Sequence, residues 1–181
     1  MTEFEFDPRK FAELLLFFAK SSEDDRFFGS TKLNKMLFVA DFFAYGYFGC
    51  PITGATYIHL PYGPAPRELL PIRERLQEEG RLDLREQELF IGTQKRPVAL
   101  DDPDTSVFSE KELALACSVL GEFENIPAGS ARDWSHTVMG WMLTEDREEI
   151  PYHTVFMFQQ EPVTMADLRW AQETAQQLSS S

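Results

Sequence analysis

Residues 30–48 read STKLNKMLFVADFFAYGYF, and they constrain the architecture more than any other stretch of the chain. Apolar residues recur at the three- and four-residue spacing of one helix face: Leu33, Met36, Leu37, Ala40, Ala44 and Tyr47. A second apolar series lies on another face: Phe38, Phe42 and Tyr45. Ser30 or Thr31 is expected to cap the helix. Because so much of its circumference is apolar, we predict a helix that is buried on several sides.

Three charged residues interrupt this apolar pattern. Lys32 and Lys35 share a face with apolar residues, and we expect their stems to cover apolar surface while the ammonium groups reach water. A partner-binding stripe is the alternative for the two lysines. Asp41 is the only charged residue within residues 36–48. Because a buried, unpaired carboxylate would be too costly, we expect Asp41 to be a hydrogen-bonded anchor for the loop that follows.

That loop, residues 53–66, reads TGATYIHLPYGPAP. Residues 57–60 predict a short strand, and prolines then stiffen the chain and are expected to prevent regular structure before the next helix: Pro61, Pro64 and Pro66. Gly63 can adopt backbone angles that are closed to other residues. The pattern predicts a rigid loop with an aromatic tip, Tyr62, which either contacts a partner or packs into the core.

The remaining elements follow from local patterns. A helix is predicted after Pro8, another over residues 71–79, one after the Ser109–Glu112 capping-box spacing, a short one from Ser130, and a last one from Thr164. Leu82 and Leu84 are expected to pair with Leu89 and Ile91 in a hairpin that turns near Glu86 and Gln87. Residues 151–158 are ambiguous between strand and extended loop. The fold class is therefore α+β: a predominantly helical single domain, residues 1–178, with a small antiparallel sheet and a disordered tail at 179–181.

Composition restricts the class of partner. The chain of 181 residues has 17 Lys plus Arg and 30 Asp plus Glu, which gives a net charge of −13, and residues 101–181 carry −11 of it. Because phosphate binding depends on clustered basic residues, nucleic acid is an unfavourable partner and a basic protein a better one. There is no apolar run that could span a membrane and no CxxC pattern around Cys50 or Cys117. A reduced, cytoplasmic location is expected.

No residue pattern predicts catalysis or cofactor binding. Asp133, Ser135 and His136 are the nearest approach to a nucleophile with a base, but adjacent residues on a helix point about 100° apart. Phosphate-binding glycine motifs and metal-ligand spacings are absent, so we expect no cofactor and no metal. His136 is interpreted as a structural or contact residue.

Two motifs together resemble a known family. The run KLNKMLFVADF at residues 32–42, followed by PITG at 51–54 and YIHLPYGP at 57–64, is similar to the Panacea domain, also called the SocA-like antitoxin domain. The resemblance covers about residues 8–160 and includes the Ser135-His136 pair followed by Trp141. The chain differs from the family pattern at residues 137–140, TVMG, where acidic residues are common in the family.

The resemblance implies a mainly helical α+β antitoxin that binds and neutralises a toxin, usually encoded beside it; some relatives are thought to deliver the toxin to a protease. It implies partner-binding or motif roles for Lys32, Lys35, Asp41, Gly54, Tyr57, Pro61, Tyr62, Gly63, Pro64, His136 and Trp141. Two other functions remain open. One is a small hydrolase that uses Ser135 or Cys50 with His136. The other is a DNA-binding autoregulator, which ranks last because no predicted helix is strongly basic.

Overall fold

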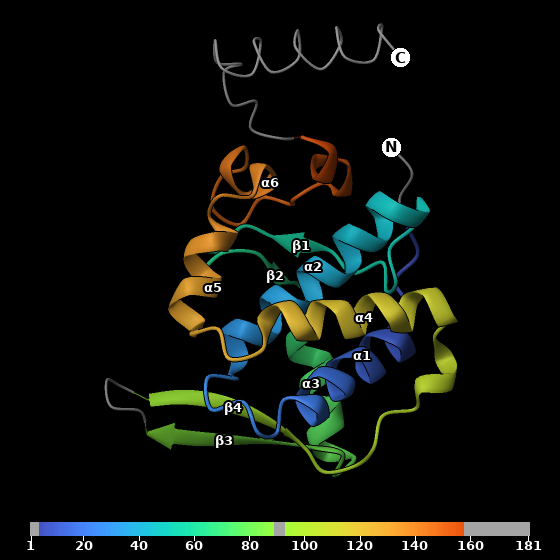
Figure 1. Ribbon diagram of the computed structural model, residues 1–181, viewed down its shortest axis with the longest axis vertical. Helices are drawn as coiled ribbons and strands as arrows, with labels where there is room; N and C mark the ends of the chain where they lie inside the picture. The colour runs from blue at the N-terminus through green and yellow to red at the C-terminus, as the bar shows by residue number, and fades with distance from the viewer. Residues whose placement is uncertain (1–3, 89–92, 158–181) are drawn as a thin grey trace, which may run out of the picture.

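A computed structural model describes residues 4–88 and 93–157 of the protein. Figure 1 shows a long helix, α2, crossing the molecule between the other helices, with two small sheets at different places around it. The predicted class, predominantly helical α+β, is confirmed. In chain order the elements are α1 (Pro8–Ser21), α2 (Ser30–Phe48), β1 (Tyr57–Ile58), β2 (Ala65–Pro66), α3 (Leu69–Glu78), β3 (Leu82–Glu88), β4 (Thr93–Ala99), the 3-10 helix η1 (Thr105–Val107), α4 (Glu110–Phe123), α5 (Ala128–Ser135), α6 (Met139–Met142) and the 3-10 helix η2 (Tyr152–Phe156).

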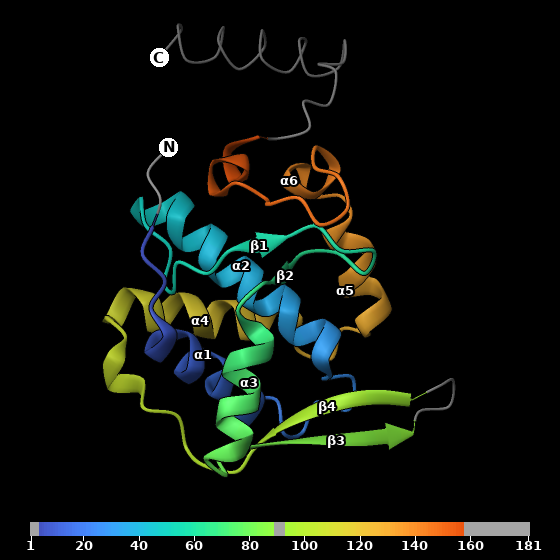
Figure 2. The same ribbon diagram turned by 180° about the vertical axis from the view of Figure 1, so that it is seen from behind.

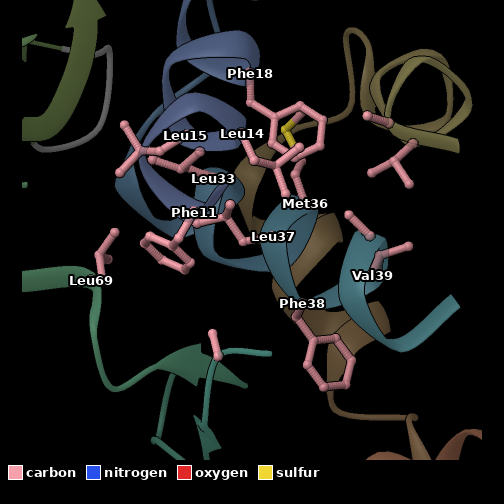
Figure 3. Packing of buried hydrophobic residues seen from close by; sticks show 14 of the residues in the cluster. Phe11, Leu14, Leu15, Phe18, Leu33, Met36, Leu37, Phe38, Val39 and Leu69 are labelled. Carbon is pink, nitrogen blue, oxygen red and sulfur yellow. The ribbon is translucent and has the colours of Figure 1, made fainter. Parts of the chain in front are cut away.

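The core forms around α2, as its apolar pattern predicts. Side chains of α1 meet those of α2 in Figure 3, where Phe11, Leu14 and Phe18 lie beside Leu33, Met36 and Leu37. Helix α4 packs on another side of α2, and η2 covers part of the C-terminal half of α2. Burying this many large apolar side chains is the main favourable contribution to folding. Helix α2 is therefore enclosed by elements from both ends of the described chain.

The β3–β4 hairpin differs from the predicted one. Glu86 pairs with Lys95 and Gln87 with Gln94, so the predicted turn residues lie inside the strands. The connection falls at residues 89–92, which lie outside the described part of the chain, as do the predicted partners Leu89 and Ile91. The prediction was wrong because it followed apolar alternation, whereas the end of this hairpin projects from the body with polar side chains and is held by backbone pairing (Figure 2).

Sheet β1–β2 corrects a second expectation. Ala65 and Pro66 pair antiparallel with Ile58 and Tyr57, and α3 begins at Leu69, so regular structure does form among the prolines. Proline is tolerated here because β2 is an edge strand and needs no outward N–H donor. The other edge of β1 is paired with the segment around Glu149, which forms a bridge to Ile58. Both edges of β1 are therefore occupied.

Arg96 joins the hairpin to the connection between α1 and α2. Its guanidinium group donates hydrogen bonds of 2.7–3.3 Å to four backbone carbonyl oxygens: those of Ser22, Glu23, Asp25 and Phe28. Ser30 contributes to the same junction, since its hydroxyl donates to the carbonyl of Lys95. Neither Ser30 nor Thr31 caps α2, whose N-cap is Gly29, because this hydroxyl is directed to the hairpin instead.

Most other predicted helices form close to the expected places. The Ser109–Glu112 capping box is present and starts α4, while α5 begins at Ala128, two residues before the predicted Ser130. Residues 152–156 form a 3-10 helix, which resolves the ambiguous segment. The predicted helix from Thr164 and the tail at 179–181 lie outside the described residues, so the single-domain boundary at 178 stays a prediction. In the part of the chain that the structure describes, no helix combines the length and apolarity that crossing a membrane requires.

Candidate functional site

A tight turn at residues 60–64, here called the Tyr62 turn, connects β1 to β2. The N–H of Gly63 donates to the carbonyl of Leu60 at 2.8 Å, which closes the turn. Two side chains from distant elements hold its ends: the indole N–H of Trp141 donates to the carbonyl of Leu60 at 3.1 Å, and the Nζ of Lys35 donates to the carbonyl of Pro64 at 2.8 Å. The turn is thus fixed to α6 on one side and to α2 on the other.

Gly63 is buried and has a φ of +89°, in the left-handed region that favours glycine. A Cβ atom at this position would lie 2.3 Å from the hydroxyl oxygen of Ser135 and 2.8 Å from the Nζ of Lys35. The backbone of the turn therefore packs directly against α5 and α2. Pro64 is buried beside Gly63, whereas Pro61 is exposed.

Tyr62 projects outward from this rigid backbone. Its residue exposure is 69%, so the alternative in which the ring packs into the core is wrong. The reason is that the closed turn directs its buried side toward Ser135 and Lys35, which leaves the adjacent residue facing solvent. The predicted rigid loop with an aromatic tip is confirmed in its geometry. Contact with a partner stays a prediction.

The two lysines of α2 are not at the surface, contrary to expectation. Lys35 is 1% exposed, its ammonium group donates to Pro64, and no carboxylate pairs with it within the described ranges. Burial lowers the pKa of Lys35 to about 7. Lys32 is equally buried, pairs with Asp25 and donates to the carbonyl of Ile126 at 2.9 Å. The carbonyl acceptors, Pro64 and Ile126, lie far away in sequence, where local spacing gives no information, and the spacing did not reveal the nearer partner Asp25 either.

Asp41 is the hydrogen-bonded anchor that the sequence predicts. Its fully buried carboxylate accepts the backbone N–H of Thr53 at 2.7 Å, the hydroxyl of Thr53, and the phenol hydroxyl of Tyr57 at 2.9 Å. Burial raises the pKa of Asp41 to about 6, and these hydrogen bonds partly offset that effect. Nearby, Gly54 has a φ of +70° and approaches the carbonyl of Glu5. These motif residues therefore hold the start of the loop against α2.

His136 and Trp141 form part of an aromatic stack. The Trp141 ring lies between the imidazoles of His136 and His59, with ring centroids at 4.1 and 4.2 Å. The Nε2 of His136 is buried without a hydrogen-bond partner in the described segments, and burial lowers its pKa. No role was predicted for His59 from the sequence. Its position inside the YIHLPYGP motif was the signal that could have indicated its contact with Trp141.

The Ser135-His136 pair does not have the geometry of a nucleophile and base. The hydroxyl of Ser135 donates to the carbonyl of Arg132 at 2.7 Å, and Ser135 is fully buried behind Gly63. Cys50, the other proposed nucleophile, is exposed just after the end of α2. Within residues 4–88 and 93–157, no group of three or more His, Cys, Asp or Glu is placed to hold a metal ion. The motif residues thus fix the backbone of the Tyr62 turn and leave the Tyr62 side chain exposed.

The fold and these contacts define an α+β domain in which a buried helix orders an exposed turn. A comparison with protein-family models matches residues 33–142 to "Antitoxin SocA-like, Panacea domain". This match covers more than half of the chain, within the broader region, about 8–160, in which the motifs suggested it. The chain belongs to the SocA-like antitoxin family with the Panacea domain. No curated protein and no solved structure gives a significant match.

Proposed function

We propose that this protein is the antitoxin of a toxin–antitoxin system and neutralises a cognate toxin, encoded by the adjacent gene, through direct binding in the cytoplasm. Membership of the SocA-like antitoxin family is the observation that carries this proposal. The toxin it neutralises is a basic protein, since residues 101–181 carry −11 of the net charge of −13.

The Tyr62 turn is the element that we place at the centre of the toxin interface. Three hydrogen bonds fix its backbone before any partner binds, so little conformational entropy is lost when Tyr62 is covered. Tyrosine is one of the residues that most often dominate binding energy at interfaces. Trp134, which is 42% exposed on α5, directly precedes the Ser135 that contacts the turn. Tyr62 and Trp134 would form the aromatic centre of the contact.

The geometry supports binding over the two alternative functions. A hydrolase that uses Ser135 would need its hydroxyl free for an activating base, whereas this hydroxyl is buried and donates to a backbone carbonyl. A DNA-binding role is opposed by the charge of the chain. We therefore propose that neutralisation needs no catalytic step by this protein.

The test compares two exposed tyrosines. Tyr62 and Tyr47 are 69% and 72% exposed, but Tyr47 lies near the end of α2 and not on the fixed turn. In cells that express the adjacent gene, Tyr62→Ala should abolish protection and weaken the purified complex at least tenfold, while Tyr47→Ala should retain both. Neither change should move the melting temperature, because both rings face solvent. Full protection by Tyr62→Ala would exclude the turn from the interface, and absence of any complex with the wild-type protein would reject the antitoxin proposal itself.

The half-life of the toxin separates the two routes of neutralisation. Direct blocking predicts that the toxin persists, inactive, in a complex with this protein. Delivery to a protease predicts that the toxin disappears faster when this protein is present. A chase experiment with and without this protein measures the difference. Rapid loss of the toxin would assign proteolytic delivery in place of blocking.

A further inference from the structure

A cavity of about 300 Å³ lies where α1 ends, α2 begins and α4 ends. Its lining combines apolar and polar groups. Met36, Leu120 and Phe123 contribute apolar surface, and Met36 and Phe123 are buried. The volume is at the lower end of the range for ligand pockets, which suits a single side chain or a small group.

Ser22 gives this cavity an unused hydrogen-bonding group. The residue is 4% exposed and lines the cavity, yet its hydroxyl makes no hydrogen bond with any residue that the structure describes. Lys32 and Asp25 also line the cavity, but they satisfy each other as an ion pair. Because Ser22 lines the cavity, its hydroxyl is available to hydrogen-bond a group that enters.

The charge of the cavity selects a cation. Asp24 and Glu124 stand exposed on its lining and form no ion pair with described residues. Because Lys32 neutralises Asp25, these two carboxylates set the charge of the site. The C-terminal ends of α1 and α4 also meet here, and helix C-termini carry partial negative charge. The apolar part could hold the methylene stem of a long cationic side chain.

We infer that this cavity receives an arginine or lysine side chain of the bound toxin, a step that rests on the proposed antitoxin function. Helix α5 follows the end of α4 in the chain (Figures 1 and 2), and it links the cavity to the Tyr62 turn through two side chains. Phe123 packs edge-on against Trp134 at 6.0 Å, and the next residue, Ser135, contacts Gly63. One partner that lies over α5 would therefore reach both features.

The first experiment needs no toxin. Arginine capped as its N-acetyl methylamide is titrated into the full-length protein, and amide chemical shifts are followed by NMR at constant ionic strength. The capped citrulline, which has the same shape without the charge, is the control probe. We expect saturable shifts at Ser22 and Gly121 with the arginine probe only. Absence of these shifts, or equal shifts with citrulline, would overturn the assignment of a cation site.

The second experiment uses a pair of glycines. Gly121 lines the cavity on α4 and Gly129 lies on α5, and a Cβ atom at either would meet no atom within 4 Å. Gly121→Met should therefore fill the cavity without backbone strain and weaken toxin binding at least tenfold, while Gly129→Met should bind as the wild type does. If the wild type binds the toxin and Gly121→Met binds equally well, this inference fails and the proposed function stands. If the wild type binds no toxin, the proposed function fails, and a toxin side chain is then also rejected as the occupant of the cavity.

Discussion

At the scale of single residues, Gly63 combines a backbone conformation and a close contact that a side chain would disturb. Gly63→Ala should lower the free energy of unfolding by about 1–3 kcal/mol, because alanine at positive φ is strained and its Cβ would collide with Ser135. Gly80→Ala is the matched control, since Gly80 has a φ of +71° with nothing within 4 Å. Urea unfolding of both variants separates the collision from the strain. Equal losses of unfolding free energy in the two variants would contradict close packing of the Tyr62 turn against Ser135.

Lys35 makes stability depend on pH in a predictable direction. The pKa of Lys35 is lowered to about 7, so the unfolded chain, with an ordinary lysine pKa near 10.5, binds more protons between pH 7 and 10.5. The contribution of Lys35 to stability therefore rises with pH in this window, by at most about 1.4 kcal/mol per pH unit. Lys35→Met should lack this rise, and Lys111→Met, an exposed lysine on α4, should retain it. Urea unfolding at several pH values measures the slope; a Lys35→Met slope like that of the wild type would refute the assignment.

The role of Asp41 was predictable from the sequence, whereas the burial of Lys32 and Lys35 was not. Asp41 was assigned correctly because a lone carboxylate in an apolar helix must be hydrogen-bonded, and its partner Thr53 lies in the loop that follows. Lys32 and Lys35 were misplaced at the surface because Ile126 and Pro64 accept their hydrogen bonds from other elements. The same limit applied to His59, whose contact with Trp141 crosses from β1 to α6.

At the scale of elements, Arg96 makes most of the hydrogen bonds that attach the β3–β4 hairpin to the α1–α2 connection, with smaller contributions from Gln94 and Ser30. Arg96→Ala should lower the free energy of unfolding by about 2–4 kcal/mol, since hydrogen bonds to charged groups contribute about 1.5–3 kcal/mol each and water can replace some of them. Arg85→Ala is the control, because Arg85 lies on the same hairpin and its ion pair among the described residues is with Asp83, two positions away. Urea unfolding again gives the comparison. Equal, small losses for both variants would mean that contacts other than those of Arg96 hold the hairpin in place.

Element types followed the sequence more closely than element ends. Helices α1, α2 and α4 formed where apolar periodicity predicts them, and at α4 the predicted capping box also marks the start, since these signals are local. The hairpin extended past the predicted turn because backbone pairing continues where apolar alternation stops. Strand β2 was missed because Pro66 within it and Pro64 before it disfavour a strand unless the strand lies at an edge, and edge position is a property of the whole fold.

At the scale of the whole molecule, charge should govern how fast the toxin arrives. Residues 101–181 carry −11, so a basic toxin would be attracted before contact, and this attraction is screened beyond roughly 8 Å at physiological ionic strength. Between about 50 and 500 mM salt, the association rate should fall more than the dissociation rate rises. Stopped-flow measurements test this. A constant association rate with a tight complex would leave recognition to the Tyr62 turn and limit the acidic surface to solubility.

The occupied edges of β1 bear on aggregation when the protein is produced in excess over its toxin. Open strand edges recruit strands from other molecules, but β1 is paired on one side with β2 and on the other with the segment near Glu149. On β2, Pro66 supplies no N–H to an incoming strand. The projecting part of the hairpin has Arg85, Glu86 and Glu88 on β3, and charged side chains oppose flat pairing. Free protein, in excess over its toxin, should therefore resist self-association through β-strand pairing.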